Sequence, residues 1–152
     1  MGVKVLFLCV HNSARSQMAE AYLKKFGGDH FIPESAGLEP GKLNPLAIEV
    51  MKEDGIDISK NQTKGVFNYF TQGKIFHYVI TVCDGASADK CPIFPGIHEK
   101  IGWHFSDPST FSGTHQEKLA RTRKVRDQIK QAVFDFIKKI NMNEISRTSG
   151  NK

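Results

Sequence analysis

Segments with the pattern of buried strands alternate with segments of helical spacing in this chain, and this alternation restricts the fold more than any other feature. Residues 3–8 (VKVLFL) are apolar and β-branched, and from Ser16 apolar side chains recur at helical spacing until Gly27 and Gly28. Further strands are predicted at residues 31–36, 77–82 and 101–105, and further helices from Pro45, with Asn44 as cap, and from about Thr114 to Ile140. The pattern predicts a single-domain α/β fold with a four-stranded parallel sheet and helices on both faces, which binds ligands at the carboxyl ends of its strands.

The size of the chain, 152 residues of which 39% are hydrophobic, corresponds to one globular domain. We assign residues 1–140 to that domain and residues 141–152 (NMNEISRTSGNK) to a polar C-terminal tail, which we expect to be flexible. No apolar run approaches the ~20 residues of a membrane span, and residues 3–8 are too short for a signal peptide. We therefore expect a cytoplasmic monomer with no membrane partner.

The net charge of +5 favours a polyanion or a small anionic ligand. Part of that charge lies in the segment KLARTRKVRDQIKQ. This segment could instead be the water-exposed face of a helix, with no role in binding. We therefore expect a small anion as ligand and no nucleic-acid partner.

Cys9 ends the first predicted strand, and the residues after it lead into the N-terminus of a helix, where unpaired backbone N–H groups favour an anion. The same helix end, the guanidinium of Arg15 and a hydroxyl from Ser13 or Ser16 would keep Cys9 a nucleophilic thiolate at neutral pH. Arg15 can also hold two oxygens of a tetrahedral anion at once. The predicted oxyanion-binding loop consists of Val10, His11, Asn12, Ser13, Ala14, Arg15 and Ser16. The alternative is an inert cysteine at the end of a buried strand.

Cys83 and Cys91 complete an odd number of cysteines, which favours reactive or redox thiols over a structural disulfide framework. Cys83 ends a predicted strand, so it can lie at the same sheet edge as Cys9. If residues 84–90 are helical, the Cα atoms of Cys83 and Cys91 are ~12 Å apart, and a disulfide needs less than ~7 Å. A bond between them therefore requires this segment, DGASADK, to unwind, which its composition makes easy. The alternatives are core packing and a zinc site with distant histidine ligands.

Four motifs occur together: CVHNSARS after VLFLC, ESAG at residues 34–37, GIDIS at residues 55–59, and Asp107-Pro108. In this order, over about residues 3–140, they resemble the low-molecular-weight protein tyrosine phosphatase fold. With VCDGASADKCP, which contains Cys83 and Cys91, the chain resembles the thioredoxin-coupled arsenate reductases built on that fold.

The resemblance implies an activity and a role for each motif residue. Arsenate would be reduced to arsenite with electrons from a thioredoxin-like partner, through sulfur alone and with no metal or organic cofactor. The implied roles are nucleophile for Cys9, oxyanion clamp for Arg15, organiser of the loop for Asn12, general acid for Asp107, and redox relay for Cys83 and Cys91.

The role of Asp107 also follows from the chemistry, because an oxygen that leaves arsenate or phosphate needs a proton in the transition state. A carboxylic acid on a loop can deliver that proton. The alternative is that Ser106, Asp107 and Pro108 only form a turn.

A bound potassium ion is a further feature of some members that the chain resembles. They use an Asn, a Glu and a Ser that match Asn12, Glu20 and Ser35, and an aspartate at the position of Lys64. An ammonium group at that position could replace the ion, so we predict catalysis without a potassium requirement. The alternative is that Lys64 faces solvent.

Two other functions stay open on the sequence. The same loop could serve a phosphatase that acts on phosphotyrosine or small phosphate esters. Ser109 argues against a phosphotyrosine specialist, since phosphatases of this fold usually carry a tyrosine after the Asp-Pro pair. The third candidate is a non-catalytic thiol sensor of arsenite or zinc, which would leave Arg15 and Asp107 without a role.

Overall fold

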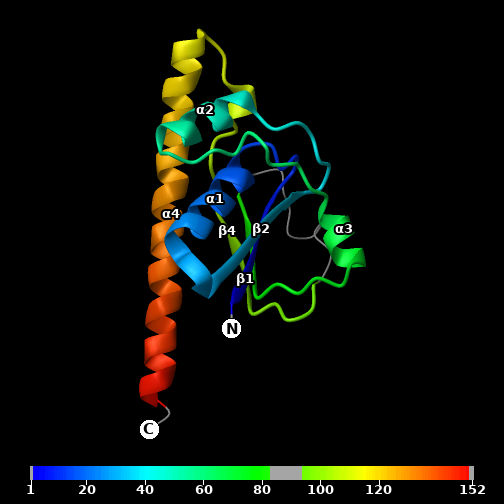
Figure 1. The fold of residues 1–152 in the computed structure, drawn as a ribbon, viewed down its shortest axis with the longest axis vertical. Helices are drawn as coiled ribbons and strands as arrows, with labels where there is room; N and C mark the ends of the chain where they lie inside the picture. Colours follow the sequence, from blue (N-terminus) through cyan, green and yellow to red (C-terminus); the bar gives the residue numbers. More distant parts are fainter. Residues whose placement is uncertain (1, 83–93, 151–152) are drawn as a thin grey trace.

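Four parallel strands form the centre of the molecule, in the order β2-β1-β3-β4 (Figure 1). The structure is a computed structural model that describes residues 2–82 and 94–150, with side chains described as far as Glu144. The strands are β1 (Val3–Cys9), β2 (Phe31–Gly37), β3 (Tyr78–Thr81) and β4 (Glu99–Gly102). The prediction of a four-stranded parallel sheet is confirmed.

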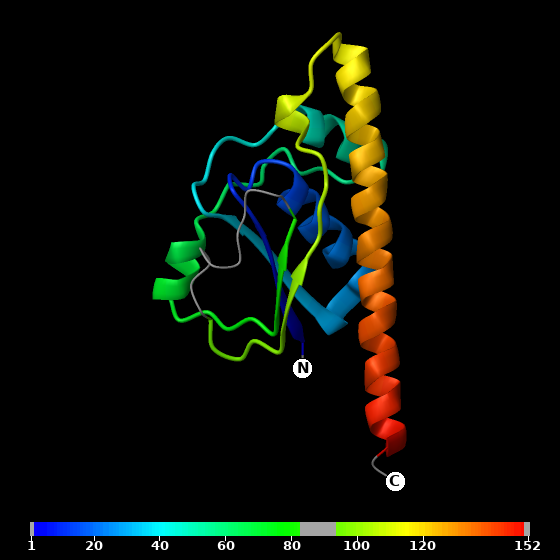
Figure 2. The same ribbon diagram turned by 180° about the vertical axis from the view of Figure 1, so that it is seen from behind.

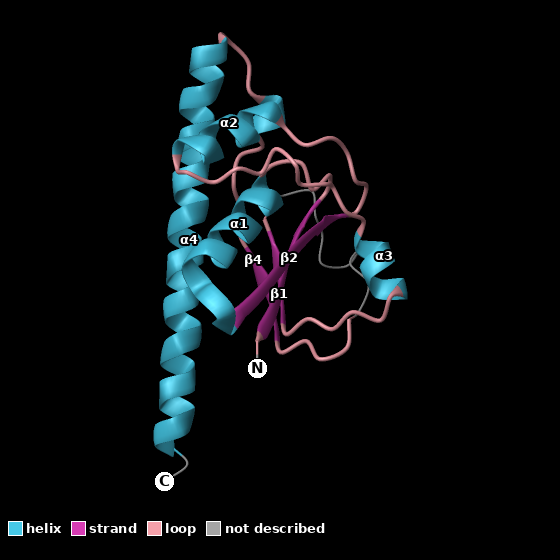
Figure 3. Ribbon diagram, viewed as in Figure 1, coloured by secondary structure: helices cyan, strands magenta, loops and turns pink. Residues whose placement is uncertain are grey.

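Helices cover both faces of this sheet, as predicted (Figures 2 and 3). They are α1 (Arg15–Gly27), α2 (Pro45–Glu53), α3 (Val66–Thr71) and the long α4 (His115–Gly150). Short 3-10 turns, η1 (Gly28–His30) and η3 (Pro108–Thr110), lie between these elements. None of the helices within the described residues is both long and apolar enough to cross a membrane.

β1 is buried on both of its faces because successive side chains of a strand point to opposite sides. Val5, Phe7 and Cys9 point into the core that α1, α2 and α4 cover. Leu6 and Leu8 point into a second, smaller core together with side chains of α3. The alternation explains why the predicted first strand is apolar at nearly every position.

One strand boundary differs from the prediction, and one helix was not predicted. The prediction placed the fourth strand at residues 101–105, later in the chain than β4 itself. Glu99 and Lys100, at the start of β4, are exposed and give no apolar signal, whereas Trp103 and Phe105, after its end, are apolar and pack against the core. The helix α3 was not predicted, because its six residues are too few for helical spacing to be recognised. The predicted cap of α2 is confirmed, since the Asn44 side chain accepts from Leu46 N at 2.9 Å.

The C-terminal tail also differs from the prediction, because α4 continues through Gly150 instead of ending at Ile140. Ile140 is buried at the end of the apolar stripe, and no proline or glycine interrupts the chain from there to Gly150. An established helix propagates at one hydrogen bond for each added residue. Glu144 adds a contact, since its carboxylate lies 2.9 Å from His30 Nε2. The boundary between domain and tail at residue 140 is therefore not an end of regular structure.

His77 links the start of β3 to β1 in both directions. Its Nδ1 accepts from Lys4 N at 2.9 Å, and its own N–H donates to Lys4 O at 2.8 Å. The His98 ring stacks against it with centroids 5.4 Å apart. Partial burial lowers the pKa of His77, and the nearby His98 and Lys4 lower it further. Protonation of Nδ1 would also remove the acceptor for Lys4 N–H.

The stability of the protein should therefore fall as the pH drops below about 6.5, where the unfolded chain binds a proton at His77 more readily than the folded chain does. We predict that the thermal midpoint of the wild type falls by about 2 °C more than that of His77→Asn between about pH 7.5 and about pH 5.5. Asparagine can keep an acceptor for Lys4 N–H but does not titrate. Equal pH dependence in the two proteins would contradict the prediction.

Candidate active site

The loop between β1 and α1 lies at the carboxyl end of the sheet, where the fold predicts a ligand site. Backbone amides of residues 38–44 bind its carbonyl groups from one side. The pairs are Leu38 N to Cys9 O at 3.1 Å, Glu39 N to Val10 O at 2.8 Å, Gly41 N to His11 O at 3.0 Å and Asn44 N to Ser13 O at 2.8 Å. A trans peptide directs its N–H opposite to its C=O, so the N–H groups after these carbonyls point away from residues 38–44, to the other side of the loop. An anion on that side would meet several donors at once.

Asn12 holds the centre of this loop. Its backbone is in the left-handed region, with φ 56°, which costs roughly 1 kcal/mol or more for a residue other than glycine. The buried side chain offsets that cost through hydrogen bonds of about 1 kcal/mol each. Nδ2 donates to Ser16 Oγ at 2.8 Å, and Oδ1 accepts from Lys64 N at 2.9 Å. These contacts fix Asn12 at the centre of the loop, and its role as organiser of the loop stays a prediction.

Gly37, at the end of β2, lies directly beneath the loop. A Cβ atom at this position would lie 2.7 Å from Val10 O and 2.9 Å from Asn12 N, closer than backbone atoms allow. Only glycine therefore lets the loop pack on the strand end. This is a physical reason for the glycine of the ESAG motif.

Arg15 lies at the first position of α1 with only 7% of the residue exposed. Its Nη1 donates to Phe105 O at 3.1 Å, and its Nη2 lies 3.3 Å from Asp107 Oδ2. The third nitrogen of the guanidinium, Nε, is buried and meets no acceptor among the described residues. A buried donor without an acceptor is rare, and a bound oxyanion would supply one. The guanidinium therefore keeps one buried N–H group without an acceptor among the described residues, beside the loop between β1 and α1.

Asp107 is distant from Arg15 in the sequence but lies beside it in the fold. A general acid for the anion loop has to lie this close to the loop. It caps the turn η3, where its Oδ1 accepts from Ser109 N at 2.9 Å. The residue is thus both a turn former, as the alternative interpretation held, and a neighbour of the anion loop. Its side chain is 31% exposed, which leaves a path for proton exchange with solvent.

Glu20, Ser35 and Lys64 also meet, beneath the loop. Ser35 Oγ donates to Glu20 Oε1 at 3.2 Å, and Lys64 Nζ lies 3.7 Å from the same oxygen and 3.4 Å from Gln62 O. Burial raises the pKa of Glu20, and the charge of Lys64 acts in the opposite direction. The Lys64 ammonium therefore lies beside the Glu20 carboxylate and the Gln62 carbonyl, and it does not simply point into solvent.

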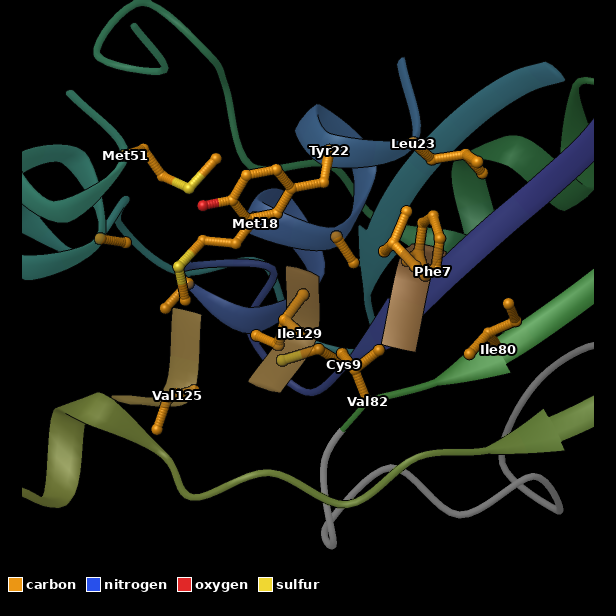
Figure 4. Close-up of a cluster of buried hydrophobic side chains, with 14 of the residues drawn as sticks. Phe7, Cys9, Met18, Tyr22, Leu23, Met51, Ile80, Val82, Val125 and Ile129 are labelled. Atoms are coloured by element: carbon orange, nitrogen blue, oxygen red, sulfur yellow. The ribbon is translucent and has the colours of Figure 1, made fainter. Parts of the chain in front are cut away.

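Cys9 is 3% exposed and belongs to the core between the sheet and the helices, near Val82 and Ile129 (Figure 4). Val82 N donates to Leu8 O at 3.0 Å, which joins the end of β3 to the end of β1 beside Cys9. The predicted relay residues Cys83 and Cys91 lie outside the described residues, as do the thiols needed for the zinc alternative. Among the described side chains, in residues 2–82 and 94–144, no three of His, Cys, Asp or Glu gather into a metal site.

The remaining polar residues of the predicted loop are His11, Ser13 and Ser16. His11 is exposed, and its Nδ1 donates to Glu39 O at 2.9 Å. Ser16 is buried as the acceptor for Asn12, whereas Ser13 is partly exposed. Of the two serines proposed as hydroxyl donors, Ser16 is thus engaged within the loop.

Two contacts of the site were not predicted. Gln17 and Asn61 form a hydrogen-bonded pair beneath the loop, and the Phe105 carbonyl accepts from Arg15. Gln17 precedes the apolar pattern of α1, so nothing in the sequence marks it as buried. A backbone acceptor such as Phe105 O leaves no signal in the side-chain sequence at all.

Residues 4–146 match the protein family described as low molecular weight phosphotyrosine protein phosphatase. An arsenate reductase of Halalkalibacterium halodurans is 43% identical over 137 residues, which are 90% of this chain and 96% of the relative. A solved structure of an arsenate reductase in the phosphate binding state has a TM-score of 0.75 at 33% identity and covers 91% of this chain and 98% of its own. A thioredoxin-dependent arsenate reductase of Corynebacterium glutamicum has a TM-score of 0.69 at 29% identity, with 93% of this chain and 63% of that chain covered.

Proposed function

The chain belongs to the low molecular weight phosphotyrosine protein phosphatase family, and we propose that within it this protein is an arsenate reductase that draws electrons from a thioredoxin-like partner. The observation that carries the proposal is the buried Arg15, whose Nε meets no acceptor among the described residues, beside a loop that begins with Cys9. The similarity to arsenate reductases supports arsenate as the anion. The proposal includes a cytoplasmic, monomeric enzyme, since its thiols need a reducing compartment.

The first step is attack by the Cys9 thiolate on arsenic. Arg15 and the loop N–H groups hold the arsenate oxygens and stabilise the charge that develops on them. Asp107, protonated in this step, gives its proton to the oxygen that leaves, which departs as water or hydroxide. The product is a Cys9–arsenate adduct, with arsenic still in the +5 state.

The second and third steps use the two other thiols. The Cys83 thiolate attacks the Cys9 sulfur, the S–As electron pair stays on arsenic, and arsenite leaves with arsenic reduced to the +3 state. The Cys9–Cys83 disulfide that remains is attacked at Cys83 by the Cys91 thiolate, which releases Cys9 and forms Cys83–Cys91. A dithiol of a thioredoxin-like protein then reduces this bond. Support for the second step comes from Val82, which precedes Cys83 in the chain and is hydrogen-bonded to Leu8 next to Cys9.

A coupled assay tests the proposal. NADPH oxidation is followed with thioredoxin and thioredoxin reductase, with arsenate present or omitted, and para-nitrophenyl phosphate hydrolysis is measured alongside. If the protein is an arsenate reductase, thioredoxin reductase oxidises NADPH in this mixture only when arsenate is present. Hydrolysis of the ester without arsenate-dependent oxidation would identify a phosphatase instead, and neither activity would favour a thiol sensor.

We propose further that Lys64 takes the place of a potassium ion. Its ammonium lies 3.7 Å from Glu20 Oε1, and the same oxygen accepts a hydrogen bond from the Ser35 hydroxyl. Both Glu20 and Lys64 line a cavity of about 630 Å³, so a cation from solvent could reach them if the ammonium were absent.

The wild-type rate should therefore change less than about twofold when potassium replaces sodium at constant ionic strength. Lys64→Asp puts a carboxylate at this position and should acquire potassium activation of about fivefold, since two acidic groups then need a counter-ion. Initial rates in a potassium titration measure both effects. Strong potassium activation of the wild type would show that Lys64 does not replace the ion.

A further inference from the structure

Gln17 is a fully buried amide that connects the anion loop to residues 61–64. The two N–H groups of its Nε2 meet three acceptors, Asn12 O at 3.2 Å, Asn12 Oδ1 at 3.0 Å and Gln62 O at 3.0 Å, so one N–H is shared between two oxygens. Its Oε1 accepts from Asn61 Nδ2 at 3.2 Å. Both ends of this amide are thus hydrogen-bonded, and two of the contacts reach the residue at the centre of the loop.

These contacts matter because the conformation of Asn12 controls the direction of the loop N–H groups. Its φ of 56° is an unusual value that neighbouring groups must hold in place. Gln17 contacts Asn12 through both the backbone oxygen and the side-chain oxygen, and the second of these also accepts from Lys64 N. A rotation at Asn12 would break these contacts together.

Residues 61–65 are themselves fixed to the loop's supports. Gly37 N donates to Lys64 O at 2.8 Å, and Thr63 Oγ1 donates to Gly41 O at 2.6 Å. Gln17 bridges this braced segment, through Gln62 O and Asn61, to Asn12. Through Gln17, the fixed position of residues 61–65 therefore restricts the movement of Asn12.

We infer that Gln17 is a positioning residue of the anion site, which holds Asn12 in its left-handed conformation and so aims the loop N–H groups at the oxyanion and at the Cys9 sulfur. The inference rests on the proposed function, because arsenate is taken to be the anion that this loop binds. Gln17 touches neither arsenate nor sulfur itself. Its effect appears in the affinity for a tetrahedral anion and in the reactivity of Cys9.

Gln17→Met tests the inference, since methionine has a similar length but no amide. Inorganic phosphate serves as the probe anion, with its affinity measured by calorimetry. Cys9 reactivity is measured as the pH profile of iodoacetamide alkylation, read by mass spectrometry on the tryptic peptide of residues 5–15 (VLFLCVHNSAR), which contains no other cysteine. We expect phosphate to bind about tenfold more weakly and the midpoint of the Cys9 profile to rise by about one pH unit.

Tyr22→Phe is the matched control, because it removes another buried hydrogen bond of α1, from Tyr22 Oη to Asp54 Oδ2 at 2.6 Å, outside the loop. It should leave both readouts at wild-type values. A folded Gln17→Met with wild-type phosphate affinity and Cys9 profile would overturn the inference.

Asn61→Ala is the second variant and decides the matter if Gln17→Met does not fold. Asn61 is only partly buried, and its loss releases the Oε1 end of Gln17. A smaller shift in the same direction supports the inference, and unchanged readouts contradict it. Failure of the proposed function is distinguishable, because a wild type that binds phosphate but does not reduce arsenate refutes the reductase and leaves these two measurements valid.

Discussion

Cys9→Ser is expected to abolish arsenate reduction, with a loss of at least about 10⁴-fold even in the first turnover. A serine hydroxyl is almost fully protonated at neutral pH, and its oxygen cannot form the disulfide that the next step requires. The measurement is arsenite released in a single turnover at enzyme concentrations above the arsenate concentration.

Phosphate affinity is the control for this variant. Arg15 and the loop N–H groups do not involve the Cys9 side chain, so Cys9→Ser should bind inorganic phosphate within about threefold of the wild type. Arsenite release by a variant that binds phosphate normally would show that Cys9 is not the nucleophile.

Arg15→Lys is expected to lower kcat/KM for arsenate by about 10²- to 10³-fold. The guanidinium contacts Phe105 O and Asp107 at once and still has Nε directed at no acceptor among the described residues. One ammonium group keeps the charge but cannot reproduce this planar arrangement of donors. The loss should therefore appear although the charge of the site is unchanged, and steady-state kinetics in the coupled assay measures it.

Arg121→Lys is the matched control, since Arg121 is an exposed residue of α4 whose Nη1 donates to Ser112 O at 3.3 Å. It should leave kcat/KM unchanged within about twofold. Wild-type kinetics in Arg15→Lys would mean that positive charge alone is sufficient and that the clamp geometry described above has no role.

The parts of the fold that the sequence predicted are those with a strong local signal. β1 and α1 combine an apolar run, a loop and a regular apolar stripe, and Asn44 with Pro45 marks the start of α2. α3 was missed because it is short, and its packing against the second core depends on residues distant in the chain. The continuation of α4 past Ile140 was missed because residues 141–150 are mostly polar, although no proline, and no glycine before Gly150, interrupts them.

The candidate site likewise contains residues that the sequence predicted and residues whose roles depend on tertiary contacts. Residues whose chemistry the resemblance named, Cys9, Arg15 and Asp107, lie at one edge of the sheet, and the pair of Arg15 with Asp107 is direct. Gln17 and Phe105 could not be predicted, because a buried glutamine and a backbone carbonyl acquire their roles only from the tertiary packing around Asn12 and Arg15. Sequence patterns report which groups can react, whereas the groups that hold them in place depend on the fold.

The relay of three thiols predicts that Cys91→Ser completes a single turnover only. This variant keeps Cys9, Arg15, Asp107 and Cys83, so it should release one arsenite per enzyme molecule and then stop. The measurement is single-turnover arsenite release followed by tryptic mapping of the disulfide, which is possible because the three cysteines lie on separate tryptic peptides. We expect one equivalent of arsenite and a Cys9–Cys83 disulfide that thioredoxin reduces poorly. Continued cycling of Cys91→Ser with thioredoxin at the wild-type rate, with no such disulfide, would contradict it.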